Sequence, residues 1–258
     1  MEGRFTVPKD HYLDVALDAL GQYYPGARCA FLAGSIIRAE GKENSDIDIV
    51  VMYGDDFDDP HRHSIWYRGW IIEFFVHNER AQDFLFVRDA KQGVSPLLHM
   101  IAFGNILGPD LNYAMNRQHY ARRLWEKGPD PFLPEEIDRS RYGISSRIDD
   151  LRDDRRVLER FGIISELYQD IILFYFRAKG EWGGHGKHLG RRMYNERPDL
   201  CLRLENAFQK AVAGQVDDFV DFCLEMIAPY GGYLQAGYLS KMSPEWRYFE
   251  PKSPKMPV

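Results

Sequence analysis

The stretch FLAGSIIRAEGKENSDIDIVVMYG, residues 31–54, interrupts apolar sequence typical of β-strands with a Gly-Ser pair and two aspartates. Successive side chains of a strand point to opposite faces of a sheet, so Asp46 and Asp48 should point to the same side. Two carboxylates held so close repel each other and raise each other's proton affinity unless a cation lies between them. Because such oxygen ligands suit Mg²⁺ or Mn²⁺, the pair predicts a divalent-cation site at the start of a strand.

A Gly-Ser pair and a third carboxylate lie near the two aspartates in the sequence. Gly34 and Ser35 close an apolar strand and open a predicted short helix, where free N–H groups and a hydroxyl can hold phosphate oxygens. Glu73 lies in WIIEFFV, residues 70–76, an apolar strand in which an unpaired carboxylate is costly to bury. Simpler interpretations stay open: an exposed strand start for the aspartates, and a rim residue or an arginine partner for Glu73.

The Gly-Ser pair, the two aspartates and Glu73 together form a more specific signal than any one of them alone. GSIIRAEGKENSDIDIVV, residues 34–51, followed by IIEFF, residues 71–75, resembles the signature of the DNA polymerase beta-like nucleotidyltransferase superfamily, over roughly residues 25–80. Two divalent ions clamped by three carboxylates stabilise the attacking and leaving oxygens of an in-line phosphoryl displacement. The resemblance therefore implies nucleotidyl transfer that depends on Mg²⁺ or Mn²⁺ and uses a nucleoside triphosphate, with ATP as the first candidate.

The resemblance also implies roles for individual residues. Gly34 and Ser35 would hold the triphosphate, and Asp46 and Asp48 would bind the catalytic metals. Glu73 would be the third metal carboxylate and the best candidate for the base that deprotonates the acceptor.

Two more nucleotide-binding candidates come from the same motif. Ser45 is the serine of its Ser-Asp-x-Asp element, and Arg38 falls where the family often has a basic residue near the phosphates. The glycine that usually follows soon after this basic residue is displaced to Gly41, a departure that weakens the assignment of Arg38 alone.

A glycine-rich basic segment, GEWGGHGKHLGRRM at residues 180–193, supplies a further candidate. Lys187 could meet the triphosphate, helped by Arg191, because a point charge and helix N-terminal amides favour an anion. The alternative is an ordinary connector with solvated charges.

Two other pairs of residues carry weaker hypotheses. Glu166 and Asp170 are four apart on a predicted helix, so one of them could act as a base, although a solvated helix face is the simpler interpretation. His61 and His63 could form a metal pair, but they lack a third soft ligand and favour an exposed strand entrance.

The first half of the chain predicts a small mixed sheet with helices, and the whole chain an α+β fold. Apolar spacing predicts a helix over 9–23 and further helices between 81 and 128. Strands are expected within 27–34 and 45–56, and a hairpin over 62–78 with its turn at Arg68-Gly69.

The second half predicts an all-helical bundle with no strand. Prolines 129, 131 and 134 mark the best candidate linker. We therefore expect a nucleotidyltransferase domain over 1–127, a helical domain over 135–250 and a flexible tail over 251–258. This size and order of domains is similar to that of bacterial antibiotic nucleotidyltransferases of the kanamycin, streptomycin and lincosamide types.

The composition limits the classes of partner that are expected. The net charge of -6 argues against stable nucleic-acid binding, which needs a basic surface. No apolar run approaches the roughly 20 residues of a membrane span, and the first thirty residues lack a signal-peptide core, so a cytoplasmic protein is expected. The three cysteines are widely spaced and predict buried thiols rather than a zinc site or disulfides. A homodimer is a further hypothesis about partners.

The predicted function is transfer of a nucleoside monophosphate from a triphosphate to a hydroxyl of a small molecule, with release of pyrophosphate. Aminoglycosides and lincosamides are the candidate acceptors, and antibiotic resistance the candidate role. Two alternatives stay open: a nucleotide-binding or regulatory module that transfers nothing, and transfer onto a protein or RNA.

Overall fold

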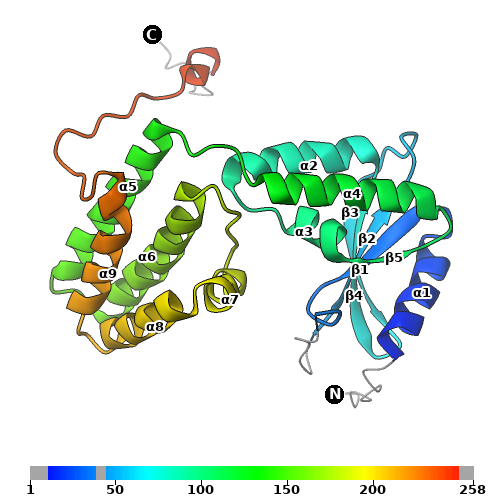
Figure 1. The fold of residues 1–258 in the computed structure, drawn as a ribbon, viewed down its shortest axis with the longest axis horizontal. Helices are drawn as coiled ribbons and strands as arrows, with labels where there is room; N and C mark the ends of the chain where they lie inside the picture. The colour runs from blue at the N-terminus through cyan, green and yellow to red at the C-terminus, as the bar shows by residue number, and fades with distance from the viewer. Residues whose placement is uncertain (1–10, 39–44, 250–258) are drawn as a thin grey trace, which may run out of the picture. The chain divides into compact units, whose positions relative to one another are not determined.

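The computed structural model describes residues 11–38 and 45–249 and divides the chain into two compact units (Figure 1). The first comprises Met1–Phe132 with Tyr175–Cys201, and the second Leu133–Phe174 with Leu202–Val258. The expected helix start at residues 9 and 10, the displaced Gly41 and the tail over 251–258 lie outside the described residues.

The first unit is built on a five-stranded mixed sheet of order β3-β4-β2-β1-β5. Strands β2 and β4 run parallel, whereas the other neighbouring pairs are antiparallel. Together with the helices this gives the expected α+β fold. The strands are β1 Cys29–Ala33, β2 Ile47–Met52, β3 His61–Tyr67, β4 Trp70–His77 and β5 Asn105–Leu107.

The hairpin β3-β4 turns where the sequence predicted. Arg68 and Gly69 both have positive φ angles, 47° and 84°, as a tight two-residue turn requires. This turn fixes the register of the hairpin, so that Arg62 faces Phe75 and Ser64 faces Glu73.

Helices cover both faces of the sheet. Helix α1 (Tyr12–Tyr23) packs its buried residues against one face, on which Ile47, Ile49, Ile72 and Phe74 form the core. The other face is covered over β1 and β2 by α3 (Pro96–Phe103) and α4 (Leu111–Lys127). Strand β3 is the end strand of the sheet, and its Ser64 and Trp66 are exposed.

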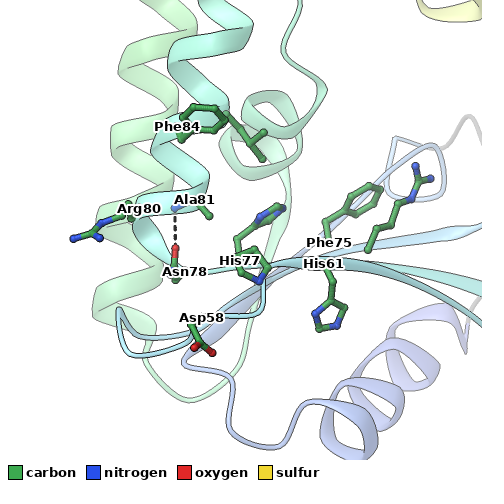
Figure 2. A pocket seen from close by; sticks show the side chains of 11 residues that line it. Asp58, His61, Phe75, His77, Asn78, Arg80, Ala81 and Phe84 are labelled. Carbon is green, nitrogen blue, oxygen red and sulfur yellow. Dashed lines mark hydrogen bonds between the residues drawn. The ribbon is translucent and has the colours of Figure 1, made fainter. Parts of the chain in front are cut away.

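Helix α2 (Glu79–Gln92) begins directly after β4. The Asn78 side chain caps it by accepting a hydrogen bond from Ala81 N at 2.7 Å (Figure 2). Asn78 also donates to Phe57 O at 2.6 Å, which ties this helix start to the loop before β3.

The sequence predicted only helix between residues 81 and 128, but three residues there form β5. Gln118 of α4 donates to the carbonyls of Ile101 and Gly104, which holds the chain in position as it leaves α3 for this edge strand. A three-residue strand is too short to show an alternating pattern, so hydrophobic spacing could not reveal it.

The first unit also includes residues 175–201, whereas the sequence placed a single boundary between 127 and 135. Trp182 is 3% exposed, stacks on Trp125 with ring centroids 5.6 Å apart and donates from Nε1 to Trp125 O at 2.9 Å. Gly183 N donates to Gly93 O at 2.7 Å. The segment containing helix α7 (Lys187–Glu196) is therefore packed against the sheet-bearing unit.

The second unit is helical, and no strand occurs among its described residues. Its first helix begins at the last proline of the predicted linker, because α4 ends at Lys127 and α5 begins at Pro134. No helix in the described part of the chain is both long and apolar enough to cross a bilayer. The remaining helices are α5 Pro134–Arg152, α6 Val157–Ala178, which starts in the second unit and ends in the first, α8 Pro198–Val212 and α9 Asp217–Ile227.

Candidate active site

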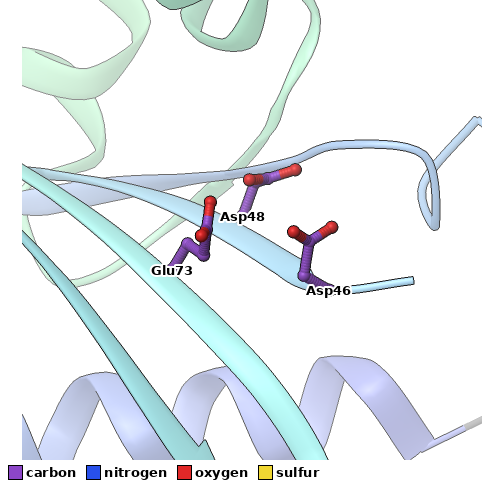
Figure 3. A group of neighbouring side chains, drawn as sticks. All are labelled: Asp46, Asp48 and Glu73. Atoms are coloured by element: carbon purple, nitrogen blue, oxygen red, sulfur yellow. The ribbon is translucent and has the colours of Figure 1, made fainter. Parts of the chain in front are cut away.

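Three carboxylates meet at the end of the parallel strand pair. Asp48 on β2 lies opposite Glu73 on β4, and Asp46 precedes β2 by one residue. All three are half-buried, and one carboxylate oxygen from each lies within 4.8 Å of the others. Figure 3 shows the three side chains on the same side of the sheet, the side opposite the α1 core. The three acids that were predicted from the sequence as metal ligands therefore lie together in the structure.

The central acid, Asp48, has a raised proton affinity. Burial, followed by repulsion from Asp46 and then from Glu73, raises the pKa of Asp48 to about 7. The positive charges of Arg62 and Arg38 oppose this rise. Like charges that raise a pKa in this way are stabilised by a cation placed between them.

The donor set suits a hard divalent cation. Carboxylate oxygens are the ligands that Mg²⁺ and Mn²⁺ prefer, and the described residues of the cluster include no thiolate or imidazole. Asp46, Asp48 and Glu73 could therefore hold such an ion.

Glu73 also has a protein partner. The Arg62 guanidinium, on the neighbouring strand β3, forms an ion pair and hydrogen bond with the Glu73 carboxylate. The Arg62 side chain is 61% exposed, whereas that of Glu73 is 19% exposed. An arginine partner for Glu73 was the simpler of the two interpretations of this residue, and the structure contains both the partner and the cluster of acids.

Gly34 makes room for Asp48. It follows the last residue of β1, Ala33, which pairs with Asp48, and its φ of +87° is one that other residues rarely adopt. A Cβ atom on Gly34 would lie 2.2 Å from Asp48 Oδ2. This glycine is thus required by the neighbouring carboxylate, a reason that the sequence alone did not give.

Ser35 and Ser45 lie together beside the acids. Ser35 Oγ donates to Ser45 Oγ at 3.1 Å, which joins the start of the loop after β1 to its return before β2. Among the described residues, 35–38 form a turn, where the sequence predicted a short helix. A hydroxyl corner is therefore present, and residues 35–38, the described part of this loop after Gly34, do not form the helix expected to support it.

Two basic candidates differ in their relation to the acids. Arg38 lies close enough to Asp48 to lower its pKa. Lys187 is exposed at the first residue of α7, and among the described residues no ion pair joins it to the three acids. Its contact with a triphosphate stays a prediction.

The weaker hypotheses have structural explanations. His61 and His63 each share a hydrogen bond with the Tyr24 hydroxyl, at 3.2 and 2.9 Å. In the second unit, Arg147 pairs with both Glu166 and Asp170, at 2.9 and 3.3 Å. The contacts of Glu166 and Asp170 favour a charged helix surface. His61 and His63 are half-buried and bonded to Tyr24, so they do not form the exposed strand entrance that was expected.

Arg62 is the neighbour of the site that sequence reasoning missed. The signal was present, because a turn at Arg68-Gly69 fixes the hairpin register. It places Arg62 two residues from Ser64, which faces Glu73, on the same face of β3. Counting back from the turn could have found this arginine.

Comparison with known proteins adds little to this geometry. No protein-family model matches the sequence, and no curated protein matches it. One similar solved structure is that of a nucleotidyltransferase-like protein from Exiguobacterium sibiricum, with a TM-score of 0.42 and 11% sequence identity. The match covers 84% of this chain and 74% of that one. A likeness this weak says nothing about the residues or the activity of this chain.

Proposed function

We propose that this protein is a metal-dependent nucleotidyltransferase that moves a nucleoside monophosphate from a triphosphate to a hydroxyl of a small molecule. The observation that supports it best is the convergence of Asp46, Asp48 and Glu73 within 4.8 Å, beside the Gly34-Ser35 corner. Aminoglycosides and lincosamides are acceptors worth testing, and ATP is the first donor to try.

Each residue of the cluster has a place in the reaction. Asp46 and Asp48 would hold divalent cations, and Glu73 would complete the ligands of the cation nearest the acceptor. Such cations would neutralise the charge that develops on the phosphates. Ser35 and the backbone of Gly34 would hold the departing phosphates, with Ser45, Arg38 and Lys187 as further contacts.

Glu73 would act at the acceptor. The acceptor oxygen attacks the α-phosphorus, its proton passes to the Glu73 carboxylate, and the bond from the α-phosphorus to the bridging oxygen breaks to release pyrophosphate. Positioning and charge neutralisation supply most of the rate in such a displacement. The Arg62 side chain would then have to leave Glu73 before the site could carry out the transfer.

The Arg62–Glu73 pair also favours a second candidate, a nucleotide-binding module that transfers nothing. In such a module the guanidinium stays on Glu73 and takes the place of a cation, because an arginine can neutralise a carboxylate as a metal does. The two candidates differ in whether a divalent ion displaces Arg62.

Pyrophosphate release tests the proposal. The four nucleoside triphosphates with Mg²⁺ should first be screened by thermal shift, since a ligand that binds only the folded protein raises its stability. The donor that shifts the melting temperature is then incubated with aminoglycosides and lincosamides. Transfer should fall by at least about a hundredfold in Asp48→Asn, by analogy with the loss of a group that stabilises transition-state charge. Undiminished release in that variant would exclude the metal role, and binding without release would favour the module.

A further inference from the structure

A cavity lies beside the candidate active site, between the end of β4 and the first turns of α2 (Figure 2). Its volume is about 630 Å³, within the range of small-molecule sites. The residues that matter for its chemistry are Arg62, Phe75, His77, Asp58, Arg80 and Phe84. All belong to the first unit.

His77 contributes a neutral ring to the lining of the cavity. The residue is 9% exposed, and its Nδ1 atom is buried with no hydrogen-bond partner. Burial, with a smaller effect of His61, lowers the pKa of His77 to about 4, so the ring is neutral at neutral pH. The ring therefore adds no charge to the cavity, and its buried Nδ1 offers a bound molecule no hydrogen bond.

Aromatic rings form the walls. Phe75 is half-buried on β4, and Phe84 of α2 is 67% exposed although it lines the same cavity. Figure 2 shows the two rings on different sides of His77. A planar aromatic molecule would cover both rings and remove exposed apolar surface from water.

The charged groups favour an anion. Arg62 lies over the Phe75 ring, with its guanidinium carbon 4.8 Å from the ring centroid. Arg80 also lines the cavity, and Asp58 is the one acidic residue among the lining residues. The start of α2 adds partial positive charge. A carboxylate or phosphate would therefore be attracted to this cavity.

Arg62 links the cavity to the candidate active site. It pairs with Glu73, and Glu73 precedes Phe75 by two residues on the same face of β4, about 7 Å along the strand. A cation bound at Glu73 would release Arg62 to pair with an anion in the cavity.

We propose that this cavity binds a planar aromatic molecule that carries one anionic group. Arg62 pairs with the anionic group, and Phe75 and Phe84 contact the ring. The release of Arg62 by a cation rests on the proposed function, whereas the cavity itself does not.

Binding is tested with 6-hydroxy-2-naphthoate as the probe, on the full chain. Calorimetry in the presence of Mg²⁺, which releases Arg62 from Glu73, gives its affinity, and nitrogen-15 NMR of the histidine rings reports on His77. The probe should shift the His77 resonances, and 2-naphthol, which lacks the carboxylate, should bind about tenfold more weakly because the charge-assisted bond to Arg62 is lost. Arg62→Gln should weaken the probe but not 2-naphthol.

A matched pair of variants on α2 separates the cavity from the rest of the helix. Phe84→Ser should weaken the probe several-fold, whereas Val87→Ser, at an equally exposed residue that does not line the cavity, should leave its affinity unchanged. Equal affinities in the wild type and Phe84→Ser, or unshifted His77 resonances, would overturn the proposal. If the probe binds as expected but no triphosphate is consumed with any acceptor, the proposed function fails and the binding site stands. If transfer occurs but the probe does not bind, the proposed binding site is refuted and the proposed function is not.

Discussion

Asp48 of β2 and Glu73 of β4 face each other in register across the parallel strand pair, with Asp46 two residues before Asp48 on the same side of the sheet. Parallel pairing is what allows acids from two distant segments to meet at one edge of the core. The antiparallel pairing of β3 with β4 places Arg62, on the other side of β4 from Asp48, in contact with Glu73.

The raised pKa of Asp48 predicts a stability change with pH in protein free of metal. Burial, and then repulsion from Asp46 and Glu73, raises this pKa to about 7, against the opposing effect of Arg62 and Arg38. Between the unfolded pKa, about 4, and 7, the folded state binds the extra proton, so stability falls as the pH rises through this window. Asp48→Asn removes this dependence and should gain about 1–2 kcal/mol relative to the wild type between pH 5 and 8, allowing for solvent screening.

Urea unfolding in EDTA at pH 5 and at pH 8 gives the unfolding free energies that measure this change. A constant difference between Asp48→Asn and the wild type across pH 5 to 8 would mean that Asp48 is ionised throughout. The acids would then not be crowded.

Gly34→Ala should damage both the fold and cation binding, because its Cβ would meet Asp48 Oδ2 at 2.2 Å. Gly180→Ala is the control, since Gly180 has a similar φ of +70° and open space around its Cβ. Backbone strain alone should cost about 1 kcal/mol at Gly180, and the clash should at least double the loss at Gly34. Equal unfolding free energies for the two variants would show that Asp48 moves aside without cost.

Arg62→Gln should tighten binding of Mn²⁺ to the three acids, because it removes a cation that competes for Glu73. The pair is partly exposed, so the gain should be about two- to fivefold. Arg62→Lys, which keeps the charge, should stay nearer the wild type. Titration with Mn²⁺, followed by electron paramagnetic resonance, gives the affinities. Weaker binding in Arg62→Gln would assign Arg62 a supporting role instead of a competing one.

Trp182→Ala should destabilise the first unit by about 3–5 kcal/mol, as truncation of a buried aromatic side chain does. Trp182 is 3% exposed, whereas Trp246 is 57% exposed, so Trp246→Ala is a control expected within about 0.5 kcal/mol of the wild type. Chemical unfolding followed by far-ultraviolet circular dichroism measures both. A small loss in Trp182→Ala would show that residues 175–201 do not stabilise the sheet-bearing unit.

Much of the catalytic half could be predicted from local patterns. Alternation placed Asp46 and Asp48 on one side of a strand, and turn chemistry located the hairpin at Arg68-Gly69, because both signals lie within a few residues of chain. Strand β5 was missed because a strand of three residues is too short to show an alternating hydrophobic pattern.

Features set by distant segments could not be predicted in the same way. The clash between a Gly34 side chain and Asp48 depends on antiparallel pairing of β1 with β2, and the burial of Trp182 depends on Trp125 more than fifty residues earlier. The glycines around Trp182 suggested a flexible connector, yet Gly183 N bonds to Gly93 O. The unsatisfied Nδ1 of His77 likewise depends on packing between β4 and α2.

The central claim is that Asp46, Asp48 and Glu73 hold a divalent cation. Mn²⁺ binding in the presence of a non-hydrolysable ATP analogue tests it most directly, with Asp55→Asn in the exposed turn after β2 as the control. We expect Asp48→Asn to lose at least about tenfold in Mn²⁺ affinity and Asp55→Asn none, and the wild-type affinity to fall by up to about tenfold per pH unit below 7 as Asp48 takes up its proton. Equal Mn²⁺ affinity in the wild type and Asp48→Asn would contradict the account.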